Sequence, residues 1–323
     1  MTDRQGAAGL EELEIDAVEG LAVEPITQWD LFWSRLRRHR LAMIAAAVLL
    51  LMVLIVALAP VLPFESPTAR QIDSTGRTLT NIGPRAGLYF GTDELGRDVM
   101  ARVVYGGQAS LIVGGVTGAI VCILGTIMGS IAGYYPGPID QSLMRFTDLV
   151  LGLPLLPVAI VVGRILPDVP WLPSWIGDGP IGIALLLGFL SWGSLARIVR
   201  AEFLSLREKE FVEAARAAGA NDRRIVFRHI LPNAISPIIV QTTLIVGIAI
   251  IIEAALSFLG FGIPPPTPTW GGIVSEGGRI AVRGYWWQLL FGGTALVVTV
   301  LSINFLGDGL RDALDPTQTI ERK

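Results

Sequence analysis

Charged side chains are scarce in this 323-residue sequence, in which 16% of residues are Asp, Glu, Lys or Arg and 52% are hydrophobic. Soluble domains carry about a quarter charged residues, so this chain has too few to cover an ordinary globular surface. The apolar residues are gathered into long uncharged runs, which is typical of an integral membrane protein. The net charge of −3 gives no reason to expect a nucleic-acid partner.

Cysteine, histidine and lysine are also scarce, and each shortage excludes a kind of site. A single cysteine, Cys122, excludes a disulfide framework. His39 and His229 are far apart and lack ligand spacing, so we expect no metal site. Neither lysine, Lys209 or Lys323, belongs to a glycine-rich G-x-x-x-x-G-K-[ST] phosphate loop. We find no catalytic constellation and therefore expect no catalytic residue and no cofactor in this chain.

Six apolar runs are long enough to cross a bilayer, which takes roughly 20 mostly apolar residues in a helix. Pro154 and Pro157 interrupt the third run, and a membrane helix tolerates proline where neighbouring helices satisfy the freed backbone groups. The predicted fold class is therefore all-α, a polytopic membrane protein with six transmembrane helices. The predicted spans are Leu41–Pro63, Ala109–Gly133, Asp148–Leu166, Ile181–Ile198, Ser236–Phe258 and Leu289–Leu306.

The distribution of basic residues predicts which side of the membrane each loop faces. Arg35, Arg37, Arg38 and Arg40 stand directly before the first span, which predicts a cytoplasmic N-terminus. Six crossings then return the C-terminus to the cytoplasm. With this topology 17 of the 25 Lys and Arg residues lie on the cytoplasmic side, in agreement with the positive-inside rule.

The spans divide the chain into segments with different roles. We expect residues 1–40 to form a cytoplasmic tail ending in an interfacial helix, because Trp29, Phe32, Trp33 and Leu36 recur at three- and four-residue spacing. A helix packed on neighbouring protein explains that spacing equally well. The predicted order is then a first span at 41–63, an external loop at 64–108, a permease core at 109–310 with a cytoplasmic loop at 199–235, and a cytoplasmic tail at 311–323.

The cytoplasmic loop between the fourth and fifth spans has the pattern of two short helices. Phe211, Ala214, Ala215 and Ala218 follow helical spacing and make one apolar face of small residues. Gly219 comes next, where a helix end favours a residue that tolerates positive φ. We expect Asn221 or Asp222 to cap the second helix and Pro232 to end it. Such an element suits docking into a groove on another protein, although a simple connector between spans remains the alternative.

A resemblance favours docking. Glu213-Ala214-Ala215, then Gly219, then Leu231-Pro232 resembles the "EAA" loop of type I ATP-binding-cassette importer permeases, with His229 departing from the usual isoleucine. In that family the loop inserts into a cleft of the ATPase subunit and transmits nucleotide-driven movement. The resemblance therefore implies an ATPase-coupling site made of Phe211, Glu213, Ala214, Ala215, Ala218, Gly219, Leu231 and Pro232.

Three further segments resemble the same family in the same order. Gly91–Asp98 is similar to the G-T-D-x-L-G-R-D signature of dipeptide, oligopeptide and nickel permeases, and Glu253–Gly260 and Leu306–Asp312 are similar to later segments of those permeases. The best match is the C-type permease. This resemblance implies the type I importer fold in a prokaryotic plasma membrane, a second homologous permease, one or two ATPase subunits that bind ATP and Mg²⁺, an extracytoplasmic solute-binding protein and contact with membrane lipid.

Polar side chains at membrane depth are candidates for the transport path. Gln241 and Glu253, both on the fifth span, are the residues we select, although a purely structural role for Glu253 is an alternative. Asp98 and Arg102 are four residues apart before the second span. We expect them to form a surface ion pair on a short outer helix rather than to contact solute.

These observations predict a permease subunit of an ATP-driven, binding-protein-dependent importer for di- or oligopeptides that supplies half of the translocation pathway. An importer of nickel or another small solute is the alternative within the family. An ion-coupled secondary transporter is the alternative from another class, and it would need midplane coupling groups and internal repeats that we do not find. ATP hydrolysis is expected in separate subunits, so this chain is not expected to be an enzyme.

Overall fold

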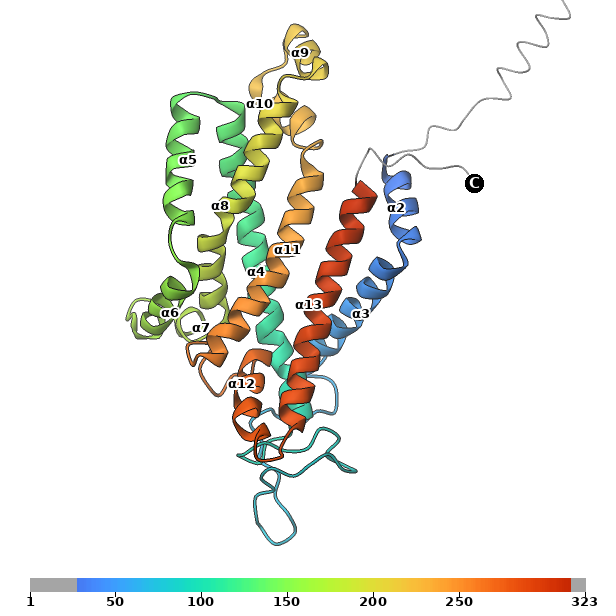
Figure 1. Cartoon of the computed structure of the whole chain (residues 1–323), viewed down its shortest axis with the longest axis vertical. Coiled ribbons are helices and arrows are strands. Elements are labelled where there is room, and N and C mark those ends of the chain that lie inside the picture. Colours follow the sequence, from blue (N-terminus) through green and yellow to red (C-terminus); the bar gives the residue numbers. More distant parts are fainter. Residues whose placement is uncertain (1–27, 315–323) are drawn as a thin grey trace, which may run out of the picture.

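The computed structural model describes residues 28–314, and within that range the chain is helical with only isolated β-bridges (Figure 1). The predicted tail up to residue 27 and the chain beyond residue 314 lie outside the described residues. The helices are α2 (Gln28–Arg38), α3 (Arg40–Ala57), α4 (Val99–Tyr134), α5 (Pro138–Leu151), α6 (Leu155–Ile165), η1 (Leu166–Asp168), α7 (Ser174–Gly177), α8 (Pro180–Leu206), α9 (Glu210–Ala217), α10 (Asp222–Arg224), η2 (Ile225–Ile230), α11 (Ile235–Phe258), α12 (Trp270–Ala281) and α13 (Trp287–Leu314).

Five of these helices are long and apolar enough to cross a membrane: α3, α4, α8, α11 and α13. They correspond to five of the six predicted spans, so the all-α membrane fold is confirmed. The helix α13 continues to Leu314, three residues past the predicted start of the C-terminal tail.

The predicted third span, Asp148–Leu166, is wrong as a single helix. The chain forms α5 and then α6, and the pair is bent by 78° at the break between them. Pro154 stands at the start of α6, where it supplies no N–H and disfavours helical geometry at the preceding residue. The helix pair is a broken span or a re-entrant loop, which brings the described spans to five or six.

Two other boundaries differ from the prediction because capping groups, not hydropathy, set them. The second span begins at Val99 instead of Ala109, since the Asp98 side chain accepts a hydrogen bond from the N–H of Met100. The first span ends at Ala57, before Pro60 and Pro63, so the connection between the two spans covers residues 58–98. The short helix α12 was not predicted.

Glycines on α4 bring three helices close together. The positions of Gly125, Gly129 and Gly133 lie against α8, where an added Cβ would meet side-chain or backbone atoms of α8 within 3 Å. Gly114 and Gly118 face α11 in the same way. The close helix contacts of the α4–α8–α11 core therefore depend on small residues.

The bundle has two unlike ends (Figure 1). The loop that contains α9, α10 and η2 projects at one end, at the top of the view, and residues 58–98 with α12 form the other end. The helix α2 lies near the α9 end, where Leu36 packs against Ala313 of α13 while Trp33 stays 49% exposed. One face of α2 thus packs on protein and another faces outward.

Candidate functional site

The α9 loop adopts the two-helix form predicted for it. Gly219 has φ of +79°, and the N–H groups of Gly219 and Ala220 donate to the carbonyl oxygens of Arg216 and Ala215 at 2.9 and 3.0 Å. This pair of bonds is the Schellman motif that ends helices. The predicted left-handed conformation of Gly219 is therefore confirmed, and it turns the chain away from α9.

The second short helix begins at a side-chain cap. The Asn221 side-chain oxygen accepts a hydrogen bond from the N–H of Arg224 at 2.9 Å, so the cap is Asn221 and not Asp222. The Asp222 carboxylate instead accepts hydrogen bonds from the hydroxyls of Tyr134 at 2.8 Å and Tyr135 at 3.3 Å. These two bonds tie the loop to the end of α4.

Buried side chains seat the same loop in the main core. Val212 of α9 and Ile225 and Ile230 of η2 belong to a hydrophobic cluster that also contains Leu195 and Phe203 of α8. Displacing α9 would disturb this packing, because close-packed interiors transmit strain. The loop is therefore mechanically connected to α8 as well as to α4.

The outward face of α9 exposes apolar residues beside charged ones. Phe211 is 39% exposed, and Glu213, Ala214 and Ala218 are also exposed. Ala215, which belongs to the predicted apolar face, packs against the core cluster, because it lies three residues from the buried Val212 on the helix.

Three other residues of this loop differ in their exposure. Leu231 packs against the core cluster, while Pro232 is exposed. Sequence analysis missed Phe227 of η2, which is 63% exposed between the buried Ile225 and Ile230. The periodicity of its neighbours could have indicated that Phe227 points outward.

The two candidates for the transport path lie apart on α11. Gln241 is partly buried, and Glu253 is fully buried. They are twelve residues apart, which corresponds to about 18 Å along a helix. The Glu253 carboxyl accepts hydrogen bonds from the hydroxyls of Ser257 at 2.8 Å and Ser110 at 3.3 Å. Ser110 in turn accepts from the N–H of Trp270, so this cluster joins α4, α11 and α12.

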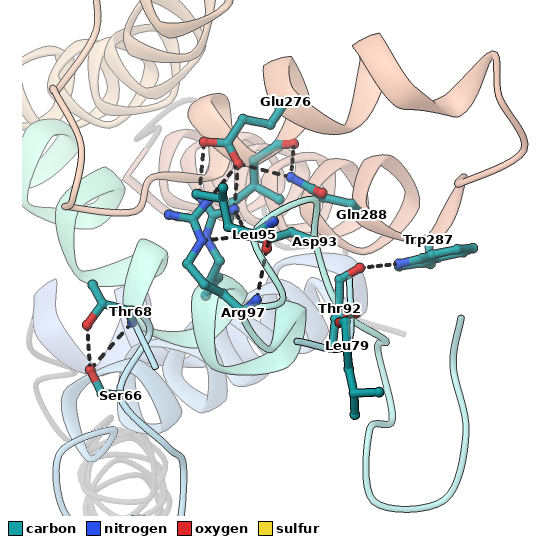
Figure 2. Close-up of polar contacts among 12 residues, drawn as sticks. Ser66, Thr68, Leu79, Thr92, Asp93, Leu95, Arg97, Glu276, Trp287 and Gln288 are labelled. Carbon is teal, nitrogen blue, oxygen red and sulfur yellow. Dashed lines mark hydrogen bonds and ion pairs between the residues drawn. The ribbon is translucent and has the colours of Figure 1, made fainter. Parts of the chain in front are cut away.

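At the other end of the bundle, a network of ion pairs includes Asp93, Arg97 and Glu276 (Figure 2). The buried Arg102 belongs to the same network. Arg102 contacts Asp93 at 2.7 Å and Glu276 of α12, while Arg97 contacts the same Asp93 at 2.6 Å. The side chains of Arg102 and Asp93 are 5% and 2% exposed. The predicted Asp98–Arg102 surface pair is therefore wrong, because Asp98 caps α4 and Arg102 turns inward to α12.

The rest of the Gly91–Asp98 segment also makes structural contacts at this end of the bundle. The Trp287 ring N–H donates to the carbonyl oxygen of Thr92 at 3.0 Å, which ties the segment to α13 (Figure 2). Gly91 and Gly96 both have φ of +76°, so the segment turns sharply at two points. Within residues 28–314 no group of three or more His, Cys, Asp or Glu side chains could hold a metal ion.

Family models match most of the chain. The model described as "Binding-protein-dependent transport system inner membrane component" matches residues 125–320, and the model described as "N-terminal TM domain of oligopeptide transport permease C" matches residues 27–84. The first match includes the α9 loop, α11 and α12.

Individual proteins resemble the chain over nearly its full length. The dipeptide transport system permease protein DppC of Bacillus subtilis is 39% identical over 88% of this chain and 84% of its own length. The DppC protein of Alkalihalophilus pseudofirmus is 40% identical, with 90% of both chains covered. The glutathione transport system permease protein GsiD of Escherichia coli is 38% identical, with 90% of this chain and 91% of its own covered.

Solved structures show the fold independently. A chain of the inward-facing MetNI methionine ABC transporter superposes with a TM-score of 0.54 at 19% identity, and the match covers 67% of this chain and 98% of that one. The fold is thus that of an ABC importer permease. From the two family models and the relatives together, the chain belongs to the family of binding-protein-dependent transport system inner membrane components.

Proposed function

We propose that this chain is one of two permease subunits of an ATP-driven importer and moves its solute when ATPase subunits act on the α9 loop. The exposed apolar face of α9, formed by Phe211, Ala214 and Ala218, is the observation that supports this proposal. A rigidly seated helix that leaves small apolar residues exposed fits a groove on a partner protein. The ATPase subunits bind ATP and Mg²⁺, and this chain binds neither and catalyses no reaction.

Movement of α9 would reach the membrane helices through contacts already described. Val212 carries it to α8 by packing, and Asp222 carries it to α4 through Tyr134. Arg207, which follows α8, also donates to the carbonyl oxygen of Tyr134 at 3.3 Å, so the two helix ends are linked to each other. ATP biases the bundle toward one conformation to the extent that it binds the two states of the ATPase pair with different affinity.

The solute that we propose is a short peptide. Relatives that cover most of the chain are named for dipeptide and glutathione transport, and glutathione is itself a modified tripeptide. Gln241 and Glu253 remain our candidates for the path. Glu253 is enclosed by α4, α11 and α12 in this conformation, so it meets a solute only when α12 moves.

The partners and orientation follow from the same proposal. The importer contains a second homologous permease, one or two ATPase subunits and an extracytoplasmic solute-binding protein, all at a prokaryotic plasma membrane with both termini of this chain cytoplasmic. The α9 loop then faces the cytoplasm and residues 58–98 face outward. An impermeant thiol reagent applied outside should label Ser66→Cys and spare Ser205→Cys, and the reverse result contradicts the orientation.

The central test changes the α9 face in the complete, co-expressed importer. Ala214→Arg places a long cation on the exposed face and should abolish both ATPase co-purification and ATP-driven uptake of trialanine. Ala86→Arg adds the same group at an exposed position at the opposite end and should leave both unchanged. Normal ATPase co-purification with Ala214→Arg would contradict the docking proposal. Uptake that survives ATP depletion and collapses with an uncoupler would indicate a secondary transporter instead.

A further inference from the structure

The end of the bundle opposite α9 contains a cavity that none of the sites above uses. Its volume is about 460 Å³, and its walls come from the end of α6, η1, the connection between α11 and α12, and α12 itself. Small-molecule sites in proteins enclose about 300–1,000 Å³. The cavity is therefore large enough for a small organic solute.

Three charged side chains in this cavity have no partner. Arg164 lies on α6, Asp168 on η1 and Arg279 on α12. None of these three side chains forms a hydrogen bond or ion pair within residues 28–314. A fourth charged side chain, Glu276, lines the cavity but already forms ion pairs with Arg97 and Arg102. The unpaired groups thus comprise two cations and one anion, which favours a ligand that offers a carboxylate and an ammonium group.

The backbone adds donors suited to a carboxylate. Gly262 and Ile263 are consecutive in the cavity wall, and their N–H groups donate no hydrogen bond to any residue that the structure describes. Ile263 is buried. Successive backbone N–H groups are a common site for a terminal carboxylate.

The shape of the cavity favours a chain over a compact ion. A second cavity of about 470 Å³ adjoins the first and shares Ser257, Gly260, Ser275 and Arg279 with it. A ligand held by its carboxylate at Arg279 can therefore extend in either direction. One wall is held in place by the ion pairs of Glu276 with Arg97 and Arg102, so the site is preorganised.

We propose that this cavity binds the zwitterionic backbone of a short peptide on its way into the transport path. Arg164, Arg279 and the N–H groups of Gly262 and Ile263 hold the carboxylate, and Asp168 holds the ammonium group. The proposal rests on the proposed function for its source of peptide, because the cavity then opens on the side where the solute arrives. It assigns to this permease a site that selects peptides with a free carboxyl end.

The test measures protection of a thiol placed in the cavity of the complete importer. Ser275 lines both cavities, so we introduce Ser275→Cys together with Cys122→Ser, which removes the native thiol. Trialanine should slow alkylation of the new thiol, and its C-terminal amide should need about tenfold more peptide for the same protection. The exposed Ser66→Cys thiol should react at the same rate with and without peptide.

Charge variants decide whether the arginines bind the peptide. Arg164→Ala and Arg279→Ala should each raise the half-protecting concentration of trialanine about tenfold and remove its advantage over the amide. Arg283→Ala is the matched control, because it deletes an exposed arginine near Arg279 that does not line the cavity. A half-protecting concentration that Arg164→Ala and Arg279→Ala leave unchanged would overturn the assignment.

Other outcomes separate this proposal from the proposed function. No protection at saturating trialanine, in a complex that still takes up trialanine with ATP, would overturn the site and leave the importer function intact. Protection by the peptide-free binding protein alone would show that a protein segment fills the cavity, which also overturns the site. Protection without any ATP-driven uptake would retain the site and contradict the importer function.

Discussion

The two ends of the helical bundle hold their functional segments in different ways. At the α9 end, an apolar face stays open and the loop is attached by packing and by hydroxyl contacts to Asp222. At the other end, polar groups of residues 58–98 are paired inward with α12 and α13 through Arg102 and Trp287. The first arrangement leaves a surface for a partner, whereas the second fixes one geometry.

The difference shows that two equally recognisable motifs can serve unlike purposes. The Glu213–Gly219 segment exposes Ala214, Ala217 and Ala218, which is expected of a docking element. In the Gly91–Asp98 segment, Thr92 and Asp93 are buried, and their polar groups form hydrogen bonds within the protein. Its resemblance to a family signature therefore reflects the shape of the end opposite α9 rather than contact with solute in this conformation.

The largest effect is expected where the ion-pair network around Arg102 is broken. Arg102→Met removes the buried cation between Asp93 and Glu276 and leaves the two acidic groups to share Arg97. Breaking a buried ion pair costs about 3–5 kcal/mol of folding free energy. Thermal unfolding of the purified complex should shift strongly downward, and cleavage of residues 58–98 by added protease should speed up.

The control for this change is an ion pair at the same end. Arg283 and Glu94 are 4.0 Å apart with both side chains largely exposed. Arg283→Ala should cost less than about 1 kcal/mol, since exposed pairs contribute little. Equal effects of the two variants would show that the buried network does not fix the end of the bundle opposite α9.

How much of the two ends the sequence predicts depends on how far apart in the sequence the interacting residues lie. The five confirmed spans follow from local hydropathy, and the turn at Gly219 follows from the helix before it. Arg102 pairs with Glu276, which lies 174 residues later in the sequence, and rules based on local residue spacing do not predict such a contact. The apolar run Asp148–Leu166 likewise did not reveal the break before Pro154, because the helix axis changes direction there while the composition stays apolar.

The helix α12 was missed for a related reason. It is short and contains Gly271, Gly272, Gly277 and Gly278, so neither its length nor its helix propensity stands out. The fold favours the helix through contacts that lie elsewhere in the chain, such as the bond from the N–H of Trp270 to Ser110.

The second prediction concerns the buried carboxyl that holds α12 to the core. Glu253→Gln keeps the shape but forces one of the hydroxyls of Ser110 and Ser257 to accept rather than donate, at a cost of about 1–2 kcal/mol. The importer should still assemble, and trialanine uptake should fall several-fold if Glu253 serves the path. Full uptake by this variant would assign Glu253 to structure alone. Comparing uptake with the yield of intact complex separates the two.

The third prediction compares equal backbone strain at the two ends. Gly219→Val forces a β-branched residue into a left-handed conformation that costs about 1 kcal/mol or more, although space for the side chain is open. Gly76 lies in the connection of residues 58–98, with φ of +84° and equally open space, so Gly76→Val carries similar strain. Only Gly219→Val should weaken ATPase docking or uncouple ATP hydrolysis from uptake. Normal coupling in both variants would make the α9 loop a passive connector.

The smallest effect should come from the hydroxyls that tie α4 to the loop. Tyr134→Phe removes the 2.8 Å bond to Asp222, and Tyr135→Phe removes the 3.3 Å bond to the same carboxylate. Each variant leaves Asp222 with one hydroxyl partner, and the carboxylate is exposed enough for water to replace the other, so the cost is about 1 kcal/mol or less. Tyr134→Phe should have the greater effect, because its bond is shorter and its ring is buried in the core cluster beside Val212. Both complexes should unfold at nearly the wild-type temperature, and the ratio of ATP hydrolysed to trialanine imported should rise more for Tyr134→Phe. An unchanged ratio in the double variant would mean that packing through Val212 alone carries the movement from α9 to the membrane helices.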